Sequence, residues 1–128
     1  MVNNKNGTVT LQIRNKFKGN NRAYSRQLKR FVKNWNKQIK KNGGSMTKRG
    51  SLTAAQEKLS ARWKRQMRKR FPNLYKGKVV GHTPDATMGG PVANGSAMPL
   101  DTSVNSYLGG IAKGVPNGTV YHKVELID

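Results

Sequence analysis

The sequence predicts a single small α+β domain, because apolar residues alternate with the period of a β-strand near both chain ends and recur at helical spacing between them. The strand pattern covers residues 8–17 and residues 119–127. A chain of 128 residues supports one domain with one modest core. We therefore expect two long basic amphipathic helices, further short helices, and a small antiparallel sheet in which the two terminal strands pair. The C-terminal strand is expected to place four side chains on one face: Val120, His122, Val124 and Leu126.

Two segments carry an apolar stripe and a basic stripe at helical spacing. They cover residues 21–42 and residues 53–71, and the glycine-containing stretch 43–50 between them is expected to be a flexible basic loop. Each segment has one tryptophan on its apolar face, Trp35 and Trp63. We expect the two helices to pack through these faces and to keep their basic stripes in water.

The charge is concentrated in the first part of the chain. The protein has 25 Lys and Arg residues and five acids, a net charge of +20, and residues 1–78 hold 23 of the basic residues with a single acid, Glu57. An uncompensated excess of this length predicts binding to a polyanion, with nucleic acid favoured. We call residues 8–78 the basic clamp region. Its candidate nucleic-acid contacts are Arg26, Lys29, Lys33, Lys37 and Lys40 on the first helix, and Arg62, Arg65 and Lys69 on the second.

Residues 79–115 hold the candidate catalytic groups. In the sequence His-Thr-Pro-Asp, His82 and Asp85 are separated by a turn that proline restricts, which can bring both side chains to one point. Asp85 could bind a divalent cation such as Mg²⁺, and His82 could share that metal or deprotonate the attacking water. The alternative is structural: Thr83 would cap a short helix, Pro84 would start it, and Asp85 would complement its dipole.

Acidic residues are scarce, which favours a one-metal site over a two-metal site. Asp128 is terminal, Glu125 faces away from Val124 on its strand, and Asp101 is expected to cap a helix with its side chain occupied by its own backbone. Asp85 is then the one acid of the C-terminal part without a structural role.

The stretch from residue 101 to residue 110 supplies polar groups at a helix N-terminus. Asn105 is expected to orient the catalytic site. Asp101, Ser103 and Ser106 are expected to hold a phosphate or to position a metal ligand, with ordinary capping as the alternative for Asp101.

Three other functions stay open. His122 is expected to be a satisfied core histidine, but together with His82 it could cleave RNA by acid–base catalysis without a metal. A non-catalytic nucleic-acid-binding protein would use residues 82–85 only to start a helix. A cationic membrane-disrupting protein is disfavoured, because the apolar stripes suit a core and no apolar run is long enough to span a bilayer. The absence of cysteine excludes disulfides, thiolate nucleophiles and cysteine-bound zinc.

Two sequence blocks carry a resemblance to a known family. The blocks Gly81-His-Thr-Pro-Asp-Ala-Thr-Met-Gly-Gly90 and Ser103-Val-Asn-Ser-Tyr-Leu-Gly-Gly110 resemble the bacterial polymorphic toxin type 15 nuclease domain, which is marked by a His-x-x-Asp motif and a downstream Asn-Ser-x-x-Gly block. With the upstream helix, the resemblance covers about residues 50–115.

This resemblance implies a magnesium-dependent DNase that acts as an antibacterial toxin. It implies secretion as the C-terminal part of a larger protein, action in the cytoplasm of a target cell, and neutralisation by an immunity protein. It gives the catalytic and metal-binding roles to His82 and Asp85 and supporting roles to Asn105 and Ser106. The strong positive charge further predicts that the immunity protein is acidic. We expect a monomeric, non-specific DNase that binds the DNA backbone.

Overall fold

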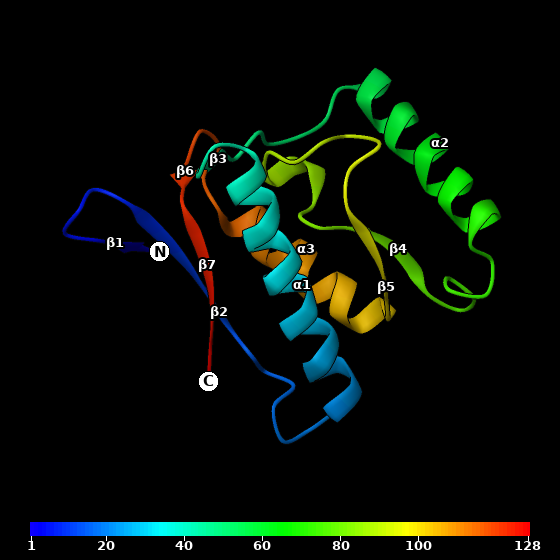
Figure 1. Ribbon diagram of the computed structural model, residues 1–128, viewed down its shortest axis with the longest axis horizontal. Helices are drawn as coiled ribbons and strands as arrows, with labels where there is room; N and C mark the ends of the chain where they lie inside the picture. Colours follow the sequence, from blue (N-terminus) through cyan, green and yellow to red (C-terminus); the bar gives the residue numbers. More distant parts are fainter.

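The computed structural model describes all 128 residues and confirms a single small α+β domain (Figure 1). It contains three α-helices, α1 (Arg22–Lys41), α2 (Ala54–Arg70) and α3 (Thr102–Gly114), and one 3₁₀ turn, η1 (Ala86–Met88). The strands are β1 (Val2–Asn3), β2 (Val9–Arg14), β3 (Met46–Thr47), β4 (Val79–His82), β5 (Ala97–Leu100), β6 (Val120–Tyr121) and β7 (Lys123–Ile127).

The terminal strands pair in parallel, so the expected antiparallel arrangement is wrong. β2 is the centre of a three-stranded sheet, antiparallel to β1 and parallel to β7, with Leu11 opposite Val124. Parallel strands require a long crossover between them. Here all three helices lie in the chain between β2 and β7, so the crossover is most of the domain.

The C-terminal strand pattern is interrupted at His122. β6 pairs with β3 and β7 pairs with β2, and the His122 backbone N–H donates to the carbonyl oxygen of Val9 over 2.9 Å. Because β6 and β7 pair with different strands, residues 120–127 do not form one continuous strand. The expectation that Val120, His122, Val124 and Leu126 share one face is therefore wrong. Tyr121 and Val124 are buried, whereas the Val120 side chain is 45% exposed.

The main core lies between α1, α3 and the sheet. The apolar side of α1 contributes Leu28, Phe31, Val32, Trp35 and Ile39 to an 18-residue cluster. Inside it, the Trp35 indole N–H donates to the Tyr121 hydroxyl over 3.0 Å. Asn21 is the N-cap residue of α1, and its side-chain oxygen accepts a hydrogen bond from the Tyr24 backbone N–H.

Helix α2 does not pack on α1 through the two tryptophans, so this expectation is wrong. Figure 1 shows α2 standing apart from α1, and the main contacts of α2 with another helix or strand are with β4. Trp63 forms a separate small cluster with Tyr75 and Val80. The helix starts at a capping box between Thr53 and Gln56, but it buries little of its apolar line. The basic stripes of α1 and α2 therefore do not belong to one packed helix pair.

The stretch from Met46 to Gly50 is a structural support and not the expected flexible loop. Its first two residues form β3, and the backbone N–H groups of Arg49 and Gly50 donate to the Thr87 carbonyl oxygen over 2.7 and 3.1 Å. The Lys48 carbonyl oxygen accepts from the Gly118 N–H. This stretch thus fixes the position of η1 relative to β6.

Gly89 is expected to tolerate no side chain. It ends η1 with a φ of +102°, and an added Cβ would lie 2.3 Å from the Thr47 carbonyl oxygen. We expect Gly89→Ala to lower the free energy of unfolding by about 3 kcal/mol or more, because a left-handed backbone conformation and a backbone collision act together. Urea denaturation followed by tryptophan fluorescence measures the loss.

Gly43→Ala is the matched control for this substitution. Gly43 has a similar φ of +88°, but an added Cβ would meet nothing within 4 Å. Only the conformational cost of about 1–2 kcal/mol is expected there. Equal losses in the two variants would show that the contact between Gly89 and Thr47 is not tight.

Candidate functional site

Asp85 is an exposed carboxylate at the start of η1. Its Oδ1 accepts hydrogen bonds from the Thr87 backbone N–H over 2.9 Å and from the Thr87 hydroxyl over 2.8 Å. The expectation that Asp85 lacks a structural role is therefore wrong, because it caps this turn in place of Thr83. Thr83 is buried and donates its hydroxyl to Ser96. Both hydrogen bonds of Asp85 use Oδ1, which leaves Oδ2 free to contact a ligand.

Asp85 borders a pocket of about 290 Å³ between η1, the end of the β3 stretch and the second half of α3. We call it the Asp85 pocket. It is lined by Lys48, Gly50, Ser51, Asp85, Thr87, Gly109, Ala112, Lys113 and Asn117. Asp85 is the one acid of this pocket, and Lys48 and Lys113 are its two cations. The two ammonium groups can attract an anion to the pocket, and the carboxylate is its one anionic proton acceptor.

Lys48 is a functional candidate that the sequence did not single out. The residue is 4% exposed, and its ammonium group donates to the Ala112 carbonyl oxygen. Burial lowers the pKa of Lys48, while the nearby Asp85 carboxylate acts in the opposite direction. The sequence offered no signal for this, because Lys48 is one of many basic residues of the chain and lay in an expected loop.

Two side chains hold the turn that carries Asp85. The Arg49 guanidinium donates from Nη1 to the carbonyl oxygens of Ala86 and Gly90, over 2.8 and 2.9 Å. From the core, the Tyr121 hydroxyl donates to the Met88 carbonyl oxygen over 2.6 Å. Because these bonds tie both sides of the turn, the Asp85 carboxylate is held in place before any ligand binds.

His82 does not enter the Asp85 pocket. The residue is 7% exposed, its Nε2 lies 3.1 Å from the Ser60 hydroxyl, and its ring stacks on Trp63 with centroids 4.5 Å apart. The imidazole thus faces α2, and it is not among the side chains that line the pocket. The structure does not bring His82 and Asp85 to one point, since the His82 ring fills the space beneath α2.

The surroundings of His82 keep its imidazole neutral near pH 7. Burial is the largest cause and the positive charge of Lys64 the second, and against the opposing charge of Asp85 they lower the pKa of His82 to about 4. A neutral imidazole can position neighbouring groups by hydrogen bonding, and here the neighbour is Ser60.

The burial of His82 predicts an acid-sensitive fold. An unfolded histidine takes up its proton near pH 6.5, whereas folded His82 does so near pH 4. Between these values the unfolded chain binds more protons, so stability is complete above pH 6.5 and falls as the pH is lowered. We expect the free energy of unfolding to decrease by up to about 1.4 kcal/mol per pH unit in this window. Urea denaturation across the window measures it.

The variant His82→Gln separates the loss of stability caused by protonation of His82 from the loss caused by protonation of acidic residues. The amide can still bond to Ser60 but does not titrate, so the decrease between pH 6.5 and pH 4 should be lost. The pKa of Asp101 is also lowered, but from 3.8, so its contribution is lost only at more acid pH. An unchanged pH slope in the variant would contradict the assignment to His82.

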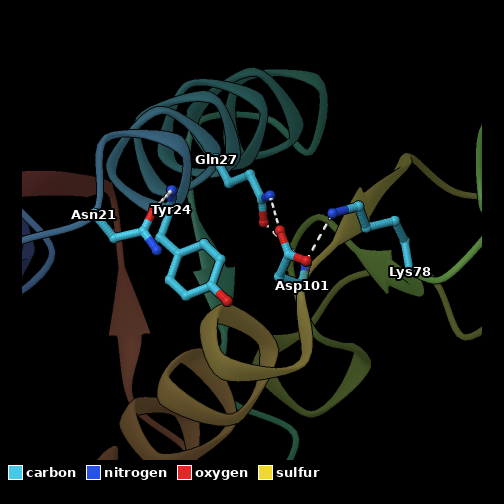
Figure 2. A network of polar contacts seen from close by, with 5 residues as sticks. All are labelled: Asn21, Tyr24, Gln27, Lys78 and Asp101. Atoms are coloured by element: carbon cyan, nitrogen blue, oxygen red, sulfur yellow. Dashed lines mark hydrogen bonds and ion pairs between the residues drawn. The ribbon is translucent and has the colours of Figure 1, made fainter.

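The Asp101 side chain joins α1 and the residue before β4 to the start of α3. The expectation that this side chain caps α3 is wrong. Its Oδ1 accepts from the Lys78 ammonium over 2.6 Å and its Oδ2 accepts from the Gln27 side-chain amide (Figure 2). Hydrogen bonds from Lys78 and then from Gln27 lower the pKa of Asp101. With both oxygens used, the carboxylate ties α1 and the residue before β4 to the start of α3, and it does not face the Asp85 pocket.

The other polar residues of α3 lie on two sides of that helix. Asn105 is half-buried and sits one turn before Gly109, on the helix face that reaches the Asp85 pocket, but it is not among the lining residues. Ser103 and Ser106 are exposed and border a separate shallow hollow with Lys16 and Tyr107. Asn105 thus lies outside the pocket wall, one helical turn from Gly109, and the two serines border a different hollow.

The predicted nucleic-acid contacts are all available to an external anion. All eight are exposed: Arg26, Lys29, Lys33, Lys37, Lys40, Arg62, Arg65 and Lys69. The two ion pairs of the protein, Lys18 with Asp128 and Lys78 with Asp101, use other residues. The positive charge of α1 and α2 is thus not neutralised within the molecule.

His122 lies on the other side of the molecule from β4, which carries His82, so the structure argues against the alternative in which the two histidines form an acid–base pair. The Nδ1 of His122 accepts from the Val9 backbone N–H over 3.0 Å, and Figure 1 shows the junction of β6 and β7 on the opposite side of the molecule from β4. His122 is thus a satisfied histidine at the edge of the sheet.

The side chains around Asp85 do not form a metal site that the protein could fill alone. No group of three or more His, Asp or Glu residues is positioned to hold a metal ion. Asp85 offers one free carboxylate oxygen, His82 points away, and two ammonium groups share the pocket. Proteins usually hold Mg²⁺ through one or two carboxylates together with waters and substrate phosphates, so Asp85 could contact the ion only as one of several ligands.

Comparison with known proteins gives no relative: no family model, no curated protein and no solved structure matches this chain. None of the helices combines the length and the apolar character that a membrane crossing requires.

Proposed function

We propose that this protein is a nuclease that binds nucleic acid through its basic surface and cleaves phosphodiester bonds in the Asp85 pocket. The observation that carries the proposal is the free Oδ2 of Asp85, held beside Lys48 and Lys113 in a protein with a net charge of +20. The basic residues supply binding, and the pocket supplies a proton acceptor next to charges that attract phosphate.

The pocket supports the following division of roles. The Oδ2 of Asp85 takes a proton from the attacking water as the water oxygen bonds to phosphorus. The bond from phosphorus to the leaving oxygen breaks, and the leaving oxygen takes up a proton from solvent. Lys113 is exposed and offsets the negative charge that develops on the phosphoryl oxygens. Lys48 holds the wall of α3 through Ala112 and adds a second positive charge. Asn105 and His82 act as positioning residues.

DNA is the expected substrate, and Mg²⁺ the expected cofactor, because the sequence blocks around His82 and Asn105 resemble a magnesium-dependent DNase family. One carboxylate oxygen is too little to hold the ion without substrate, so the requirement for magnesium rests on the resemblance. The role as a secreted antibacterial toxin rests on it as well.

A non-catalytic nucleic-acid-binding protein is the second candidate. The observation that favours it is the capping of η1 by Asp85, which gives this carboxylate a structural reason to be present. In that case the basic surface is the whole function.

One assay separates the two candidates. Supercoiled plasmid and total RNA are incubated with the protein, once with Mg²⁺ and once with EDTA. Cleavage of either substrate by wild-type protein supports the nuclease, and its restriction to DNA with Mg²⁺ would support the family resemblance. Binding without cleavage under all conditions would overturn the proposed function.

A protein inhibitor of this nuclease is expected to be acidic. Only a negative surface can cover the unpaired cations of α1 and α2 without leaving them buried and uncompensated. Its association rate should fall steeply with added salt, as stopped-flow fluorescence would measure. An inhibitor with a basic interface, or an association rate independent of salt, would contradict this prediction.

A further inference from the structure

A second and larger pocket lies beside α1, away from Asp85. Its volume is about 550 Å³, within the range of pockets that hold small ligands. We call it the Arg30 pocket. It is formed by the first half of α1, the segment after α2, and β5. The side chains that matter are Arg26, Arg30, Leu74, Lys78, Met98 and Pro99.

The two sides of this pocket differ in chemistry. Arg26 and Arg30 provide two guanidinium groups that form no ion pair with the protein. Leu74, Met98 and Pro99 provide an apolar wall, in which Leu74 is 53% exposed, Pro99 is half-buried and Met98 is only 5% exposed. Guanidinium groups bind phosphate through paired hydrogen bonds, whereas an exposed apolar wall gains by being covered with a flat apolar group. A nucleotide offers both kinds of group at once.

The pocket is also held in shape by the Asp101 network. Asp101 binds Gln27 and Lys78 (Figure 2), and both of these residues are among those that line the pocket. Because Asp101 neutralises Lys78, the charges left for a ligand are those of Arg26 and Arg30. A rigid wall lowers the entropy that binding would cost. The network therefore holds two of the side chains that line the pocket in place.

We propose that the Arg30 pocket binds one unpaired nucleotide of the substrate, with its phosphate on Arg26 and Arg30 and its base against Leu74, Met98 and Pro99. The proposal rests on the proposed function in taking nucleic acid as the ligand. A base in a duplex is paired and stacked, so it cannot reach the apolar wall. The pocket thus makes the protein favour single strands, frayed ends and loops over closed duplex.

The position of the pocket fits a substrate that continues to Asp85. Lys78 directly precedes β4, and Asp85 follows the last residue of that strand by three positions. A four-residue strand is about 13 Å long. One strand thus links the two pockets, and an anchored nucleotide would hold the neighbouring backbone near Asp85.

A matched pair of leucines tests the proposal. Leu74 and Leu59 are both exposed leucines, 53% and 51%, but only Leu74 lines the pocket. Affinity is measured by fluorescence anisotropy for a short oligothymidylate and for a closed hairpin duplex with the same number of phosphates, in the Asp85→Asn background. We expect Leu74→Ser to weaken single-strand binding about tenfold and duplex binding little, and Leu59→Ser to change neither by more than about twofold.

A charge-matched pair tests the phosphate contact. Arg30→Gln and Arg70→Gln each remove one positive charge, but Arg70 lies at the end of α2 outside the pocket. Arg70→Gln should weaken single-strand and duplex binding by the same factor. Arg30→Gln should lower the single-strand affinity by a clearly larger factor than the duplex affinity.

The site of contact can be located directly by methionine methyl NMR. Oligothymidylate should shift the methyl resonance of Met98, in the pocket wall, and leave that of Met46, buried beside β6, unchanged. Equal effects of Leu74→Ser and Leu59→Ser, or an unshifted Met98, would refute the subsite while leaving the nuclease intact. A wild-type protein that binds neither oligonucleotide would instead refute the proposed function.

Discussion

Replacing Asp85 with asparagine is expected to abolish cleavage and to leave folding and nucleic-acid binding intact. The asparagine side-chain oxygen can still accept from the Thr87 N–H and hydroxyl, so the cap of η1 is kept. What is lost is the proton acceptor at Oδ2, and proton transfer contributes about 10²–10⁴-fold to rates of this kind. We expect at least a hundredfold slower plasmid cleavage, with the affinity unchanged or slightly higher.

The matched control is Asp128→Asn. It removes one negative charge from an exposed carboxylate that pairs only with Lys18. Its cleavage rate should stay near that of wild type, and the melting temperature of both variants should be measured alongside. Full cleavage by folded Asp85→Asn protein would show that the reaction takes place elsewhere.

His82→Gln is informative because His82 lies outside the Asp85 pocket. If His82 is a positioning residue, the amide should retain much of the activity through its bond to Ser60, whereas His82→Ala should lose activity and stability together. If the imidazole itself transfers the proton, His82→Gln should be as inactive as His82→Ala although the stability of His82→Gln is kept. A comparison of cleavage rate with unfolding free energy separates these outcomes.

The second large effect expected is a steep dependence of DNA binding on salt. Each phosphate that the protein neutralises releases counterions, and the eight exposed stripe residues carry no internal partner. Contact with about six phosphates would lower the affinity roughly a thousandfold between about 50 and 200 mM salt. Anisotropy titrations of the Asp85→Asn protein with duplexes of unrelated sequence measure this, and the sequences should bind alike.

Substitutions of lysines on α1 test whether this helix contributes to the salt dependence of DNA binding. Lys33→Gln and Lys37→Gln remove exposed cations from the solvent face of the helix, and each should reduce the slope of log affinity against log salt by about one. Lys18→Gln, which removes a cation already paired with Asp128, should change the slope less. A flat salt dependence in the parent protein would rule out the basic surface as the binding surface.

The local structure of this protein could be predicted from the sequence, because it depends on residues a few positions apart. The apolar stripe of α1 and the Thr53–Gln56 capping box at the start of α2 both involve contacts of three or four residues along the chain. The excess of positive charge is a property of the composition, so a polyanionic partner could also be predicted without the structure.

The arrangement of the site depended on contacts between distant segments. Parallel pairing of β2 with β7 separates His122 from His82, and the packing of α2 on β4 buries His82 under Trp63. Lys48 joins the Asp85 pocket only because its stretch is bonded to Thr87 and to Gly118. The same motif, His-x-x-Asp, is compatible with a shared site and with two separate environments. The burial of His82 selects the two separate environments. Its imidazole is removed from water and stacked on the Trp63 indole only when α2 packs on β4, and a local sequence pattern does not encode that packing.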